Sequence, residues 1–139
     1  MRIEIAIVAL IAASACDRIP DNSQLKGVYA GQGRDALCLV APMGSEKLGA
    51  GIVTYGSGDN NCTLTGEVRT AEGAIAFYAD HDDACHFALN QESEALVLPQ
   101  QIPASCSYYC GPGASLAGKR FEKREGASRP ADFAGDPLC

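Results

Sequence analysis

The sequence predicts an all-β domain, a small antiparallel meander or barrel of about eight strands that is stapled by disulfides. Three observations lead to this prediction. Residues 62–69 alternate between apolar and polar side chains, strand-length runs recur between Gly-, Asn- and Asp-rich turns, and six cysteines follow Cys16. No amphipathic helix is long enough to cover exposed strand edges, so a closed or nearly closed barrel is favoured over the alternative, a two-sheet sandwich.

The N-terminal segment is predicted to direct export. An apolar run from Ile5 to Ala13 follows Arg2, which suits a secretory signal and is too short for a membrane-spanning helix. The residues Ala13-Ser14-Ala15-Cys16 resemble the lipobox of bacterial lipoproteins. The resemblance implies a signal peptide over 1–15 and a lipid on the Cys16 thiol. The polar stretch that follows predicts a tether over 16–24, and the remaining length fits one domain over 25–139. The resemblance also implies anchoring to a membrane on the periplasmic side of a bacterial cell envelope. The alternative is an ordinary signal peptide that is cut after Ala15.

The charge balance restricts the kinds of partner. The chain has 11 Lys and Arg against 17 Asp and Glu, for a net charge of −6. This balance disfavours nucleic acid, which needs a basic patch, and is compatible with a cationic protein partner or simply with solubility. No second apolar stretch has the length of a transmembrane helix, so we expect membrane attachment only through lipid.

Strands are expected in sequence order as follows. Residues 25–30 and 36–40 form an opening hairpin, 49–55 form a third strand, and 56–61 are the strongest turn signal. Residues 62–69, 74–79, 85–89 and 95–98 continue the meander, and residues 90–94 are expected to be a turn. The alternation predicts that Cys62, Leu64, Gly66 and Val68 face inward on one strand, and Cys85, Phe87 and Leu89 on another.

The C-terminal part differs from the preceding strands in its amino-acid composition. Residues 102–118 contain two cysteines, the pair Tyr108-Tyr109 and many small residues, and 115–118 are compatible with either a helical turn or a last strand. Residues 119–124 are the only basic cluster, and 127–138 are expected to be a loop. A disulfide at Cys139 would hold this tail in place.

Seven cysteines are an odd number for an exported chain, and lipidation of Cys16 accounts for the odd one. The remaining six are therefore candidates for three disulfides: Cys38, Cys62, Cys85, Cys106, Cys110 and Cys139. Cys62 and Cys85 would be separated by two strand spacings, about 10 Å in total. A disulfide needs Cα atoms within about 7 Å, so this pair is disfavoured and the connectivity is left open.

Residues 80–86 gather Asp80, Asp82, Asp83 and both histidines, but a solvated acidic turn is favoured over a metal site. Ser57, Ser107 and Ser115 are conceivable nucleophiles with His81 or His86. No Gly-x-Ser-x-Gly elbow occurs, however, so we predict no enzyme, no catalytic residue, no metal and no cofactor. The candidate partner-binding residues are Asp80, Asp82, Asp83, Tyr108 and Tyr109.

The chain loosely resembles the periplasmic lysozyme-inhibitor lipoproteins. The shared features are the lipobox-like signal, the size, the order of hairpins and the Gly56-Ser57-Gly58 loop. The resemblance implies a binding or inhibitory module for a protein partner, with lysozyme as the suggested partner. The Trp-x-Lys-Gly segment of that family is missing, because the chain has no Trp, so no inhibitory residue is carried over. The alternatives are an envelope-structural lipoprotein without enzymatic activity and, third, a small hydrolase. Residues 59–94 carry eight acids against Arg69 alone, and would create a negative field if their hairpins shared one end of the barrel.

Overall fold

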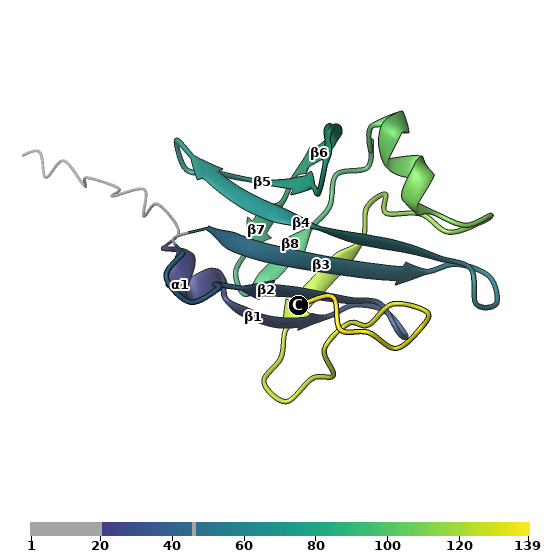
Figure 1. The fold of residues 1–139 in the computed structure, drawn as a ribbon, viewed down its shortest axis with the longest axis horizontal. Coiled ribbons are helices and arrows are strands. Elements are labelled where there is room, and N and C mark those ends of the chain that lie inside the picture. The colour runs from purple at the N-terminus through teal and green to yellow at the C-terminus, as the bar shows by residue number, and fades with distance from the viewer. Residues whose placement is uncertain (1–20, 46) are drawn as a thin grey trace, which may run out of the picture.

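The computed structural model describes residues 21–45 and 47–139, so the predicted signal peptide and Cys16 lie outside the described residues. Nine antiparallel strands form one sheet in the order β6-β5-β4-β3-β2-β1-β9-β8-β7 (Figure 1). The strands are β1 (Gly27–Ala30), β2 (Ala36–Val40), β3 (Leu48–Tyr55), β4 (Asn61–Ala71), β5 (Ala74–Ala79), β6 (Asp82–Ala88), β7 (Asn90–Glu92), β8 (Ala95–Val97) and β9 (Arg120–Lys123). Two short helices accompany them: α1 (Asn22–Leu25) and the 3₁₀-helix η1 (Ala104–Tyr109).

The sheet nearly closes on itself through one bent strand. The two strands at the ends of the sheet order, β6 and β7, are separated only by Leu89. The chain therefore leaves its pairing with β5 and continues directly into pairing with β8. Counted as one continuous strand, β6 and β7 bring the barrel to eight strands, which confirms the predicted all-β barrel-like fold.

Two segments differ from the expected pattern. Residues 90–92 were expected in a turn but form β7, and the basic cluster 119–124 contains β9. Neither segment has strong strand propensity. Each becomes a strand because a neighbouring edge supplies its hydrogen-bond partners, which is a tertiary effect. Residues 115–118 form neither a helix nor a strand.

The predicted alternation correctly identifies the interior of the barrel. Cys62, Leu64 and Val68 are at most 4% exposed, and Cys85, Phe87 and Leu89 are equally buried. The two largest fully buried side chains are Phe77 of β5 and Phe121 of β9. Burial of this apolar interior is the main favourable contribution to folding.

Gly66 of β4 makes room for one of these phenylalanines. A Cβ atom at Gly66 would lie 2.8 Å from Cζ of Phe77 and 2.1 Å from the carbonyl oxygen of Tyr78. Both distances are shorter than any tolerated contact, so the Phe77 ring occupies the space that a side chain at Gly66 would need. The two residues fill one position of the core together.

The C-terminal tail covers the outer face of the sheet. It passes in front of β2 in Figure 1 and ends at Cys139, which is bonded to Cys38 on the outward face of β2. A Cβ atom at Gly51 of β3 would approach Cβ of Leu138 to 2.5 Å, so the tail lies directly against the strand. The disulfide pins the tail, as predicted.

All six candidate cysteines are paired. Besides Cys38–Cys139, the bonds are Cys62–Cys110 and Cys85–Cys106. Cys62 and Cys85 are not joined to each other, in line with the expected separation of their strands. Instead, Cys85 bonds to Cys106 within η1, and Cys62 bonds to Cys110 directly after η1.

A buried ion pair connects the β1–β2 turn to the start of β9. Asp35 is 4% exposed, accepts a hydrogen bond from the Tyr55 backbone N–H at 2.7 Å and contacts Lys119 Nζ at 2.8 Å. The carboxylate thereby joins the β1–β2 turn to the end of β3 and to the start of β9. Its burial requires both partners, because an unpaired charge in this position would be costly.

Tyr29 is expected to make the folded protein sensitive to alkaline pH. Its hydroxyl donates to the Leu25 carbonyl oxygen at 2.7 Å, and burial, followed by the charge of Glu94, raises its pKa to about 12. Between about pH 10 and about pH 12 the unfolded chain loses this proton while the folded chain keeps it, so stability falls across that interval. Tyr29→Phe should remove this part of the fall and, at neutral pH, cost about 1 kcal/mol for the lost hydrogen bond.

Urea unfolding of both proteins at pH 9 and at pH 11 measures the difference. Equal losses of unfolding free energy in the wild type and in the Tyr29→Phe variant would contradict the assignment.

Among the described residues, no helix has the length and apolar character needed to cross a membrane.

Candidate functional site

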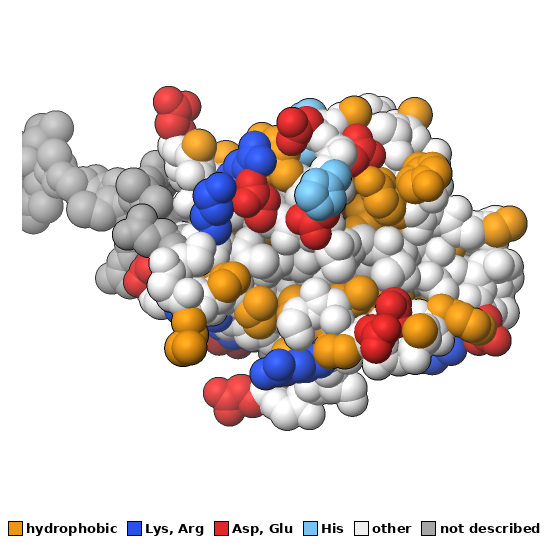
Figure 2. Space-filling model, in the orientation of Figure 1, with side chains coloured by type: hydrophobic (Ala, Val, Ile, Leu, Met, Phe, Trp, Pro, Cys, Tyr) orange, Lys and Arg blue, Asp and Glu red, His pale blue; other side chains and the backbone are white. Residues whose placement is uncertain are grey.

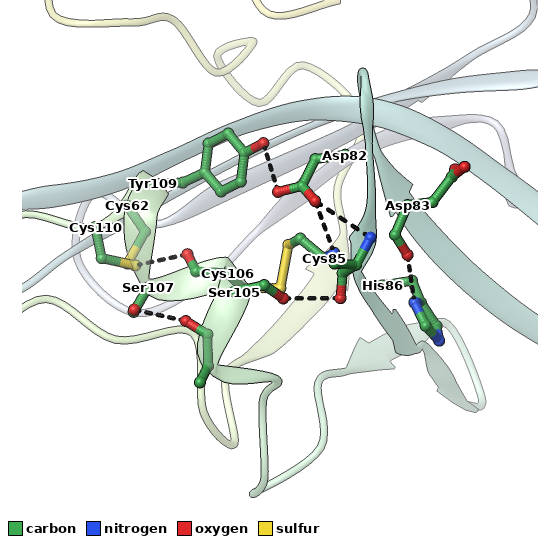
Figure 3. Close-up of a disulfide and its surroundings, with 12 residues drawn as sticks. Cys62, Asp82, Asp83, Cys85, His86, Ser105, Cys106, Ser107, Tyr109 and Cys110 are labelled. Atoms are coloured by element: carbon green, nitrogen blue, oxygen red, sulfur yellow. Dashed lines mark hydrogen bonds between the residues drawn. A yellow bond between two sulfur atoms is a disulfide. The ribbon is translucent and has the colours of Figure 1, made fainter.

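The five candidate partner-binding residues lie on one surface. Asp80 lies in the turn between β5 and β6, Asp82 and Asp83 begin β6, and Tyr108 and Tyr109 end η1. The Tyr109 hydroxyl donates to Asp82 Oδ2 at 3.0 Å, which joins two groups 27 residues apart in the sequence (Figure 3). We call these five residues the acidic–tyrosine surface.

The turn that presents the carboxylates has a clear local cause. His81 adopts a positive φ of 59°, and the register shifts between Tyr78 and Ala79. Asp82 Oδ1 accepts hydrogen bonds from the backbone N–H groups of Ala84 and Cys85 at 3.2 and 3.3 Å. Asp82 is thus engaged in holding the turn and Tyr109, whereas Asp80 and Asp83 are exposed.

The segment with the tyrosines is fastened at three points. Cys106 bonds to Cys85 of β6, and Cys110, just after η1, bonds to Cys62 of β4. Ser105 Oγ donates to the Ala84 carbonyl oxygen at 2.8 Å (Figure 3). A 3₁₀-helix of six residues has little intrinsic stability, so these bonds give the tyrosines a defined position.

The tyrosines present both apolar and polar atoms to solvent. Tyr108 is 87% exposed and packs edge-on against Tyr109, with ring centroids 5.3 Å apart. Desolvation raises the pKa of the Tyr109 phenol, and the hydrogen bond to Asp82 adds to this. Tyr109 therefore stays protonated and keeps donating to Asp82 at neutral pH.

A stack of side chains on the outer face extends the surface. Tyr78 of β5 stacks on His86 of β6, with centroids 5.1 Å apart, and the Arg69 guanidinium lies 3.9 Å from the Tyr78 centroid. Arg69 also pairs with Glu67 and interacts with the charge of Asp83, so it offsets part of the local negative field. Figure 2 shows the two histidines among acidic side chains on this face, with hydrophobic side chains beside them.

The amino-acid sequence alone did not predict this stack. Because the alternation predicts Cys85 and Phe87 to face inward, it places His86 between them on the outward face, where the structure shows it exposed. Which residues lie beside it depends on the strand register, which pairs Tyr78 with both His86 and Glu67. An alternating pattern carries no information about register.

The acidic residues do not share one end of the barrel. Successive turns of an antiparallel meander lie at opposite ends, so Asp59 and Asp80 lie at the end with η1, whereas Glu72 and Glu94 lie at the other. Glu92 pairs with Arg120 at that second end. The single negative end considered in the sequence analysis is therefore wrong, and only the part around Asp80, Asp82 and Asp83 remains.

Two of the three conceivable nucleophiles, Ser107 and Ser115, are engaged elsewhere. Ser107 and Ser115 line a pocket of about 390 Å³ beside η1. Ser107 Oγ donates to the Ala104 carbonyl oxygen at 2.6 Å, and Ser115 Oγ accepts from the Ala117 N–H at 3.1 Å. Within residues 21–45 and 47–139, no serine hydroxyl bonds to a histidine, and no three His, Cys, Asp or Glu side chains are placed to hold a metal ion.

No known protein family, curated protein sequence or solved structure matches the chain significantly. The chemistry of the acidic–tyrosine surface is therefore the basis for a functional proposal.

Proposed function

We propose that this protein is a lipid-anchored envelope protein whose barrel binds a cationic protein partner through the acidic–tyrosine surface. The observation that carries the proposal is the contact between Tyr109 and Asp82, which brings the exposed Tyr108 beside the exposed carboxylates. Carboxylates attract a cationic partner, and tyrosines supply contact area at low entropic cost. Neither group alone would suffice as an interface.

The rigidity of the surface supports this role. Two disulfides and the Ser105 hydrogen bond hold η1 against β4 and β6 before any partner arrives. A pre-ordered surface loses little conformational entropy on binding, so more of the contact energy contributes to affinity.

The position of the surface also fits a protein anchored at its N-terminus. The described chain begins with α1 at one end of the barrel, and η1 lies at the other end (Figure 1). A lipid on Cys16, only a few residues before α1, would place the α1 end toward the membrane. The acidic–tyrosine surface would then be directed away from the membrane and accessible to a partner.

Lysozyme is the cationic protein with which we would test the proposal. The variant Asp80→Asn/Asp83→Asn should reduce the rate of association with immobilised lysozyme by about tenfold at low salt, because exposed carboxylates steer the encounter. The effect should shrink as salt rises, since screening acts over about 10 Å at 0.1 M. Asp82 is left unchanged because it holds the β5–β6 turn.

The matched control neutralises two acids at the opposite end of the barrel, in the variant Glu72→Gln/Glu94→Gln. Both double variants change the net charge from −6 by the same two units, so only the position of the lost charge differs. Equal reductions in both variants, or no binding of the wild type at micromolar concentration, would contradict the proposal.

A further inference from the structure

The side of β6 that faces away from β5 is an open edge, which lies next to the acidic–tyrosine surface. β6 pairs with β5 on one side, and in the described part of the chain no strand pairs with its other side. Pairing of β8 with the bent strand reaches only to Val97, opposite Asn90. The next residue of β8 that would face this strand is Pro99, which has no N–H to donate, so the ladder ends there.

The hydrogen-bond pattern identifies the backbone groups on this edge. The Leu89 N–H donates to the Ile75 carbonyl oxygen at 2.8 Å, so Leu89 and Phe87 direct their backbone groups toward β5. In an antiparallel ladder the residues between them point the opposite way. The N–H and C=O groups of His86 and Ala88 therefore face the open side.

The edge is limited at one end by contacts already described. The Ala84 N–H donates to Asp82, and the Ala84 carbonyl oxygen accepts from Ser105. His86 and Ala88 thus offer four backbone groups, enough for a short antiparallel ladder with another strand. Natural proteins commonly block such edges with lysine or proline, and neither His86 nor Ala88 is one of these residues.

We propose that this edge binds an extended segment of the cationic partner as an added antiparallel strand. The inference rests on the proposed function for the nature of the partner. Charge complementarity selects this occupant over a second copy of the chain, because a copy carries the same net charge of −6 and does not offer the excess of basic side chains that Asp80 and Asp83 would attract. Main-chain hydrogen bonds then provide the pairing, as in other cases of strand addition.

The geometry specifies where the basic side chains of that segment belong. An added strand antiparallel to β6 runs from Ala88 toward Asp82, so residues after the paired segment approach the acidic turn. Lysine or arginine at the C-terminal side of an alternating β-prone segment would meet Asp80 and Asp83. A segment with glutamate in those positions would be repelled.

The acetylated and amidated hexapeptide TVTVKK is a suitable probe, with TVTVEE and a backbone N-methylated TVTVKK as controls. In nuclear magnetic resonance titrations of the protein, TVTVKK should shift the amide signals of His86 and Ala88 and slow their hydrogen exchange at least threefold. Both control peptides should leave these signals unchanged.

The protein variants make the test specific to the edge. Ala88→Pro removes one donor on the open side without removing a bond to β5, and should weaken peptide binding at least tenfold. Ala88→Ser keeps the donor and should bind like the wild type. Far-UV circular dichroism would check that both variants fold.

Each other outcome contradicts the proposed edge. No change at His86 and Ala88, equal binding of the N-methylated peptide, or peptide binding unaffected by Ala88→Pro would overturn it. A dimer that forms without peptide and is lost in Ala88→Pro would identify a second copy as the occupant. Lysozyme binding through Asp80 and Asp83 is measured separately, so either proposal can fail while the other stands.

Discussion

Replacing Cys38 and Cys139 together with alanine is expected to lower the free energy of unfolding by about 5 kcal/mol, the largest effect among the three disulfides. A disulfide restricts the unfolded chain, and the restriction grows with the logarithm of the loop that it closes. The three loops span 101 residues for Cys38–Cys139, 48 for Cys62–Cys110 and 21 for Cys85–Cys106. The corresponding alanine pairs should cost about 5, 4 and 3 kcal/mol.

Alanine is preferred to serine because Cys38, Cys62, Cys85 and Cys106 are fully buried, and a buried hydroxyl would add a cost of its own. Urea unfolding under non-reducing conditions, monitored by circular dichroism, gives the three free energies. The ranking is its own internal control, because each variant keeps two of the three bonds. Equal losses, or the greatest loss for Cys85 and Cys106, would show that native-state packing rather than loop closure sets the order.

Gly66→Ala is expected to destabilise the barrel by about 3 kcal/mol, at the upper end of the range for an overpacked core. The added methyl group would have to displace the Tyr78 backbone and the Phe77 ring, which are 2.1 and 2.8 Å from its position. The ring cannot move away from β4 because Phe87 of β6, on its other side, stacks on it with centroids 5.1 Å apart. The strain therefore spreads from β4 into β5 and β6.

Gly49→Ala is the matched control on the neighbouring strand β3. Its added methyl group would meet only Val40 atoms, at 3.7 Å, which is an ordinary contact. Alanine also gives the unfolded chain less conformational entropy than glycine, so less entropy is lost on folding. This variant should therefore be as stable as the wild type or slightly more stable. Thermal unfolding of both variants measures the difference. Similar melting temperatures for Gly66→Ala and the wild type would contradict the packing described for Phe77.

The strands that the sequence predicted are those whose own side chains carry a pattern. Residues 62–69 and 85–89 alternate because one face is buried in the barrel, and the structure confirms both faces. β7 and β9 have no such pattern, since their residues are mostly polar or charged. They form strands only because closure of the barrel brings a partner edge to each of them.

The candidate site was predicted as two separate groups of residues. Acidic residues in a turn and exposed tyrosines near cysteines are recognisable from local sequence alone. Their contact is not, because it requires η1 to fold back on β6, and that depends on which cysteines pair. Six cysteines permit fifteen pairings, and local sequence does not choose among them.

The sequence by itself determined the all-β class, the inward and outward faces of the main strands, and the complete pairing of six cysteines. These properties depend on the apolar or polar character of each side chain and on its spacing, which are local. Only the tertiary structure decided the disulfide connectivity, the division of the acidic hairpins between two ends, the stack of Arg69, Tyr78 and His86, and the open edge at His86 and Ala88. Each of these depends on strand register and chain closure, in which residues distant in sequence compete for the same hydrogen-bonding edge.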